Sequence, residues 1–314
     1  MLELQLHEIK DFGGIDADAD ELLRDCFQDH PAYTAAKAHE RFLVIGRKGS
    51  GKTAIFKRLI TERQPNVFSF GHTFDDYPWA YHDLQAQGGI PEERRYIHSW
   101  RYLINIGLAK LLLNVDQSQP WDEAALEALG DLENFVVDSY GSRDPDLTQL
   151  FQPQKKLRFK GSLKLSIASI EGETVLVKEL PLHIQEVNRS VQESVLTSLN
   201  PEHDYYVCFD QLDLGFTTDD PRYAQRLIGL ILAASDLWKA ARDAGKRFSV
   251  VVFLRDDIYE LLHFEDKNKI TENNMVKVEW NQGRRRSHAK GPDGASVWAS
   301  LRFGGQRSLG RRVR

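Results

Sequence analysis

Residues 42–53 constrain the fold of this chain more than any other stretch. Four apolar residues, Phe-Leu-Val-Ile, are followed at once by Gly-Arg-Lys-Gly-Ser-Gly-Lys-Thr. The apolar run predicts a short buried strand, the glycines predict a tight turn, and Lys52 with Thr53 predicts the first turn of a helix. We therefore expect an α/β fold in which this strand, turn and helix form one continuous unit.

The turn between that strand and helix satisfies the Walker A pattern G-x-x-x-x-G-K-[ST], which is typical of loops that bind nucleotide phosphates. Glycines let backbone N–H groups converge on phosphate oxygens, and the positive end of the following helix faces the same anion. Lys52 would reach the β- and γ-phosphates, and the Thr53 hydroxyl would bind Mg²⁺. The expected nucleotide-binding residues are Gly46, Arg47, Lys48, Gly49, Ser50, Gly51, Lys52, Thr53 and Ala54. The alternative is a coincidental glycine-rich turn, but its flanking strand and helix favour nucleotide binding.

A second signal lies at residues 205–213, Tyr-Tyr-Val-Cys-Phe-Asp-Gln-Leu-Asp. An apolar strand that ends in Asp210 places a carboxylate at the sheet edge that also presents the phosphate loop, as a Walker B aspartate does. There Asp210 would hold Mg²⁺, directly or through water. Gln211 stands where many hydrolytic proteins of this kind have glutamate, and glutamine orients water but cannot accept its proton. Asp213 is the nearest alternative base; otherwise hydrolysis is slow.

A third signal follows the apolar run at residues 248–254, which predicts a central strand covered on both faces. The run ends in Arg255-Asp256-Asp257. At that edge Arg255 would lie near the γ-phosphate and stabilise charge during its transfer. The alternative is a surface arginine paired with Asp256 or Asp257, and the pattern does not decide between the two.

The remaining elements follow from periodicity and end signals. Strands are predicted at about 66–72 and 275–280, and helices are predicted from 52 to about 63, from 91, at 122–138, at 182–199 and at 221–244. Residues 154–180 alternate with period two and turn at Glu171-Gly172, which predicts a β-hairpin inserted into the core. The residues that lead into this hairpin are basic. They either contact nucleic acid or an acidic partner, or form a solvated face of the sheet. The aromatic residues of the helix from 91 are expected in the core.

Composition limits the class of protein. The 314 residues are 41% hydrophobic and 28% charged, as in a soluble globular protein. Two cysteines, one of them in an apolar strand-like run, cannot form a disulfide framework, so a cytoplasmic setting is expected. The first residues resemble no signal or transit peptide, and no apolar stretch is long enough to span a bilayer.

Charge divides the chain into parts. Residues 283–314 carry nine Lys and Arg against one acid, a net +8, which leaves −13 on residues 1–282 because the whole chain carries −5. We expect a helical arm at 1–40, a nucleotide-binding domain at 41–282 and a basic low-complexity tail at 283–314. The acidic body argues against nonspecific nucleic-acid binding by the domain. Two accounts of the tail compete: a genuine basic tail that touches nucleic acid, or an end from a frameshifted or truncated reading frame.

The segments 46–53, 205–213 and 251–259, with 12–17 and 266–280, resemble a family of bacterial P-loop ATPases within the broader STAND, KAP and AAA-like (ASCE) group. The resemblance implies a parallel sheet of order 5-1-4-3-2, Asp210 between nucleotide and metal, and Arg255 as a sensor-like arginine. It also implies nucleotide-dependent switching, with antiphage defence among the roles of the wider group. Relatives continue past the last strand into a helical or winged-helix lid, which is missing or replaced here.

Three functions remain open at this point. The leading hypothesis is an ATPase that binds ATP and Mg²⁺ and switches through self-association or an effector protein; no guanine-reading motif favours GTP. The second is a small-molecule kinase. The third is a noncatalytic nucleotide-gated binding module in a DNA-processing or defence complex.

Overall fold

The computed structural model describes residues 29–62, 64–74, 77, 79, 82–83, 96–146, 149–150, 180–214, 216 and 220–279, with the side chains of 180–186 left out. The described residues up to Val278 belong to one compact unit. All of the predicted hairpin at 154–180 except residue 180, most of the predicted arm at 1–40 and the basic tail at 283–314 lie outside the described residues. Of that arm, only 29–40 is described, and it contains a short helix, α2 (Pro31–Lys37).

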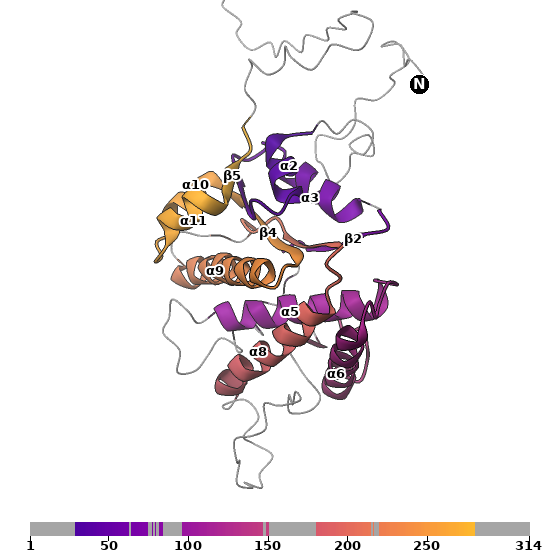
Figure 1. Cartoon of the computed structure of the whole chain (residues 1–314). Helices are drawn as coiled ribbons and strands as arrows, with labels where there is room; N and C mark the ends of the chain where they lie inside the picture. The colour runs from indigo at the N-terminus through magenta and orange to yellow at the C-terminus, as the bar shows by residue number, and fades with distance from the viewer. Residues whose placement is uncertain are drawn as a thin grey trace, which may run out of the picture. The chain divides into compact units, whose positions relative to one another are not determined.

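A five-stranded sheet forms the centre of the unit (Figure 1). In spatial order its strands are β5 (Met275–Lys277), β1 (Leu43–Gly46), β4 (Arg247–Arg255), β3 (Asp204–Phe209) and β2 (Val67–His72). Every neighbouring pair is parallel. The predicted parallel sheet and its order 5-1-4-3-2 are therefore confirmed.

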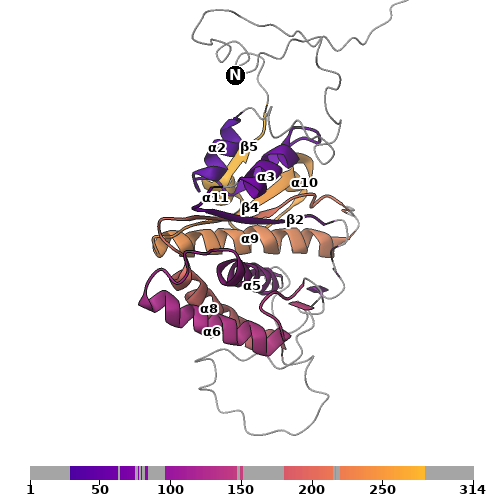
Figure 2. The same ribbon diagram turned by 90° about the vertical axis from the view of Figure 1, so that its right-hand side faces the viewer.

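Helices cover both faces of the sheet. Their bounds are α3 (Lys52–Thr61), α5 (Ile97–Asn114), α6 (Glu123–Tyr140), α8 (Leu180–Ser198), α9 (Pro221–Asp243), α10 (Asp256–Leu261) and α11 (Lys267–Asn274). Figure 2 shows α2 and α3 on one face, α9 and α5 on the other, and α6 and α8 in a further layer beyond α5. No helix of the described residues combines the length and the apolar character that crossing a bilayer requires.

The strands divide their side chains between two cores, as the period of two requires. In β3, Tyr206 and Cys208 face the core under α2 and α3, while Tyr205, Val207 and Phe209 face the larger core under α9 and α5. The aromatic residues predicted to lie in the core do so: Trp100 of α5 is 0% exposed and Tyr96 is 2% exposed.

Local signals set several element ends. The Asp220 carboxylate accepts a hydrogen bond from the Arg222 N–H at 3.0 Å, and Pro221 occupies the first turn of α9, as its N-cap and proline predict. The prediction was inexact elsewhere. The helix after the phosphate loop ends at Thr61 rather than at residue 63, and the last strand ends at Lys277 rather than at residue 280. The helices α10 and α11 had no counterpart among the predicted elements.

Candidate functional site

The carboxyl ends of three neighbouring strands bring the predicted site residues to one edge of the sheet. Gly46 ends β1, Arg255 ends β4, and the two lie opposite each other in the parallel register. Asp210 directly follows β3. The strand β4 has β1 on one side and β3 on the other. The three motifs, far apart in sequence, therefore meet where ligands bind in parallel α/β sheets.

Glycine is required in the loop between β1 and α3 for two reasons. Gly49 and Gly51 have φ angles of 74° and 95°, in the left-handed region that side chains rarely adopt. Gly46 instead lacks space, since a Cβ there would lie 2.5 Å from the Ser50 Oγ and 3.2 Å from the Val278 carbonyl oxygen. The loop thus keeps a compact shape that other residues would distort.

Lys52 begins α3 and its amino group turns back over the loop. The Nζ donates hydrogen bonds to the carbonyl oxygens of Gly46 and Arg47, both at 3.0 Å. Burial lowers the pKa of Lys52, while the nearby carboxylates of Asp210 and Asp213 oppose that shift. The side chain is therefore held above the loop, in the field of the acids at the end of β3.

Thr53 and Asp210 connect the phosphate loop to β3. The Thr53 side chain interacts with the Asp210 carboxylate, which is only 3% exposed. Burial raises the pKa of Asp210, and the interaction with Thr53 opposes that rise. Among the described residues, the Oδ2 atom of Asp210 has no hydrogen-bond partner. Such an atom is costly, at roughly 1–3 kcal/mol, and calls for a ligand or water.

Gln211 follows Asp210 in a left-handed conformation with φ of 60°, which is uncommon for a residue with a side chain. Its carbonyl oxygen accepts a hydrogen bond from the Leu214 N–H at 3.2 Å, so the chain turns sharply after β3. Backbone strain of this kind is concentrated at functional sites. The predicted water-orienting residue thus lies in a constrained turn beside Asp210.

Arg255 forms ion pairs with two carboxylates. Its Nη1 lies 3.3 Å from the Asp213 Oδ2, and its other nitrogens contact both oxygens of Asp257, with the Nε at 3.0 Å. These bonds, first that of Asp257, raise the pKa of Arg255. Arg255 thus lies opposite Gly46 and pairs with Asp257, as the surface-pair alternative predicts, and its role at the γ-phosphate stays a prediction. Asp213, the alternative base, is held by a cation.

Sequence reasoning named Asp256 and Asp257 only as surface partners of Arg255 and missed His72. Asp256 approaches the Arg47 Nε at 3.9 Å, but the Arg47 side chain is 91% exposed, so that pair is weak. The carbonyl oxygen of His72, at the end of β2, accepts a hydrogen bond from the Asp210 N–H at 3.1 Å. Burial lowers the pKa of the His72 side chain to about 4, so it is neutral at pH 7.

The donor set suits Mg²⁺, which binds few protein oxygens and keeps several waters. Thr53 offers a hydroxyl oxygen and Asp210 an unpaired carboxylate oxygen at the same point. The described residues contain no cluster of three or more His, Cys, Asp or Glu side chains that would hold a metal by themselves. Comparisons with protein-family models, with curated proteins and with solved structures found no match.

Proposed function

We propose that this protein is a P-loop ATPase that binds ATP with Mg²⁺ and acts as a nucleotide-dependent switch. One observation carries the proposal: the buried carboxylate of Asp210 at the end of β3 interacts with Thr53 at the start of α3, and its Oδ2 atom has no hydrogen-bond partner among the described residues. A buried carboxylate with an unpaired oxygen beside a loop threonine is the arrangement that a Mg²⁺-nucleotide site needs.

Each part of the edge has a role in binding. The backbone N–H groups of the loop, with Gly49 and Gly51 in left-handed conformations, surround the phosphates. The Lys52 amino group leaves the carbonyl oxygens of Gly46 and Arg47 to contact the β- and γ-phosphates. Thr53 and Asp210 hold Mg²⁺, which neutralises phosphate charge when bound.

Turnover is expected to be slow. Gln211 can orient a water molecule through its side-chain amide but cannot take its proton. Asp213, the nearest carboxylate that could act as a base, forms an ion pair with Arg255 at 3.3 Å, so its Oδ2 atom already has a partner. The ion pair between Asp213 and Arg255 favours one alternative function, a noncatalytic nucleotide-gated binding module of a DNA-processing or defence complex. No feature of the site favours the small-molecule kinase.

A titration of ATP with Mg²⁺, followed by calorimetry, tests the proposal. We expect the Lys52→Ala variant to lose at least about 100-fold in affinity, or about 2.7 kcal/mol, because the phosphates lose their buried cation. The matched control is Lys57→Ala, which removes a cation from the same helix, beyond the phosphate loop. Equal ATP affinity in the wild type and Lys52→Ala would contradict the proposal. Phosphate release then separates the candidates, since a noncatalytic module binds ATP without turnover.

A further inference from the structure

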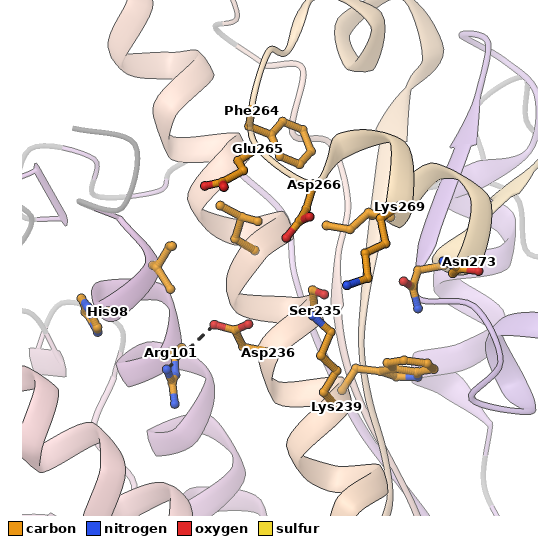
Figure 3. A pocket seen from close by; sticks show the side chains of 15 residues that line it. His98, Arg101, Ser235, Asp236, Lys239, Phe264, Glu265, Asp266, Lys269 and Asn273 are labelled. Atoms are coloured by element: carbon orange, nitrogen blue, oxygen red, sulfur yellow. Dashed lines mark ion pairs between the residues drawn. The ribbon is translucent and has the colours of Figure 1, made fainter. Parts of the chain in front are cut away.

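A cavity of about 480 Å³ lies away from the phosphate-loop edge, between the start of α5, the middle of α9 and the residues from Phe264 to Asn274 (Figure 3). None of the residues that line it belongs to the loop 46–53 or to the ends of β3 and β4. Its volume falls within the range of about 300–1,000 Å³ typical of small-molecule sites. Its walls include the apolar side chains of Ile97, Leu232, Trp238, Phe264 and Ile270.

Two buried polar side chains in its wall have no partner among the described residues. Ser235 of α9 is 2% exposed and its Oγ makes no hydrogen bond. Asn274, the last residue of α11, is 5% exposed and its Nδ2 makes none. Buried polar atoms are nearly always hydrogen-bonded in folded proteins. Both groups can donate a hydrogen bond to an acceptor that reaches them.

Charged side chains of both signs line the cavity. In Figure 3 the carboxylates of Glu265 and Asp266 come from the loop before α11, and the amino groups of Lys239 and Lys269 point toward Ser235. All four residues are exposed and have no ion pair among the described residues, whereas Arg101 and Asp236, which also line the cavity, form an ion pair at 4.0 Å. Asp266 also begins α11 without capping it, at a φ of 64°.

We propose that this cavity binds a small zwitterion that carries a carboxylate at one end and an ammonium group at the other. The carboxylate accepts hydrogen bonds from Ser235 and from the two lysines, whose charges it neutralises. The ammonium group donates to Glu265 and Asp266, and a short chain of methylenes between the two ends packs on Trp238 and Phe264. A single anion or cation would pair with only one of these two charged groups.

A calorimetric comparison of matched probes tests this site in the full chain. The zwitterions are glycine, 4-aminobutyrate and 6-aminohexanoate, and the single-charge controls are butyrate and butylamine. We expect at least one zwitterion to bind at least about tenfold more tightly than either control, because only a zwitterion pairs with both charged groups. The proposal is overturned if none of the three zwitterions binds, or if butyrate or butylamine binds as tightly as the best of them.

Two variants distinguish a binding role from a structural one. Asp266→Asn keeps a residue that tolerates a positive φ but removes the negative charge, and Ser235→Ala removes an unpaired buried hydroxyl. We expect both to weaken the best zwitterion at least about fivefold while the melting temperature stays the same or, for Ser235→Ala, rises. Asp243→Asn, an exposed acid at the end of α9, is the matched control and should bind as the wild type does. Unchanged binding in both cavity variants would overturn the proposal.

Binding at this cavity is independent of the proposed ATP site. Lys52→Ala should therefore bind the zwitterion as the wild type does, even though it loses ATP. If the zwitterion bound only to a protein with an intact phosphate loop, its binding would depend on that loop rather than on the cavity. That result would overturn the proposal.

Discussion

The two ends of β3 carry aspartates in contrasting environments. At the amino end the carboxylate of Asp204 is fully paired: its Oδ1 lies 2.9 Å from the His39 Nε2 and 2.7 Å from the Arg247 Nε, and its Oδ2 lies 2.9 Å from the Arg247 Nη2. At the carboxyl end the Asp210 carboxylate interacts with Thr53, and its Oδ2 has no hydrogen-bond partner among the described residues. Both residues are buried, at 7% and 3% exposure.

Because the strand and the burial are shared, the partners account for the difference. Burial acts to raise the pKa of both carboxylates, but the hydrogen bond to His39 and the charges of His39 and Arg247 outweigh it and lower the pKa of Asp204, whereas the pKa of Asp210 stays raised. His39 also contacts the Ser249 Oγ at 2.7 Å, which gives a Ser, His and Asp constellation, but Ser249 is 0% exposed and out of reach of a substrate. A satisfied cluster stabilises the fold, and an unsatisfied one is kept for a ligand.

The largest effect is expected at the paired end. Asp204→Ala leaves the partly buried His39 and the Arg247 guanidinium, whose side chain is 54% exposed, without their acceptor, so we expect a loss of about 1–2 kcal/mol in the free energy of unfolding. Urea unfolding of the nucleotide-free protein measures it. ATP affinity of the folded fraction should stay within about twofold of the wild type. A stability loss below about 0.5 kcal/mol would contradict the view that the paired Asp204 stabilises the fold.

A change of opposite sign in the free energy of unfolding is expected at the carboxyl end of β3, where Asp210 has an unpaired oxygen. Asp210→Asn removes a buried charge that the nucleotide-free fold does not compensate, so we expect the protein without nucleotide to gain about 1 kcal/mol of stability. The same urea experiment applies. A clear loss of stability would mean that the carboxylate is already satisfied in the folded protein.

A smaller effect is an opposite pH dependence of the two sites. The folded pKa of Asp204 is lowered, so its contribution to stability is present above the ordinary pKa near 3.8 and is lost as pH falls below it. The folded pKa of Asp210 is raised, so its contribution is present below 3.8 and is lost as pH rises. Unfolding of the wild type, Asp204→Asn and Asp210→Asn between pH 3 and pH 7 should therefore give difference curves of opposite slope. Parallel curves would contradict the assignment.

The smallest effect is expected at Arg255, whose side chain is 30% exposed. Arg255→Gln should change the free energy of unfolding by less than about 0.5 kcal/mol, because partly exposed ion pairs contribute little. The informative readout is ATP turnover. Release of Asp213 should leave turnover unchanged or raise it if the ion pair restrains that carboxylate, and lower turnover would indicate that Arg255 acts on the phosphates.

Local patterns predicted the parts of the site that are continuous in sequence. The glycines of residues 46–51 and the apolar run before Asp210 each determine a strand end, and parallel pairing then brings those ends to one edge. The sheet order came from the resemblance alone. Partner choice was not predictable, because Arg255 takes Asp213 from 42 residues away and Asp204 takes His39 from 165 away. The cavity, formed by three distant helices, left no signal in the sequence.

The most direct test is the Mg²⁺ dependence of ATP binding in two isosteric variants, Asp210→Asn and Asp204→Asn, measured by calorimetry with and without EDTA. We expect Mg²⁺ to strengthen ATP binding in the wild type and in Asp204→Asn, and to have no effect in Asp210→Asn, which lacks the carboxylate. If Mg²⁺ strengthened ATP binding equally in both variants, or if the wild type bound no ATP at all, the unpaired oxygen of Asp210 would not be a metal site.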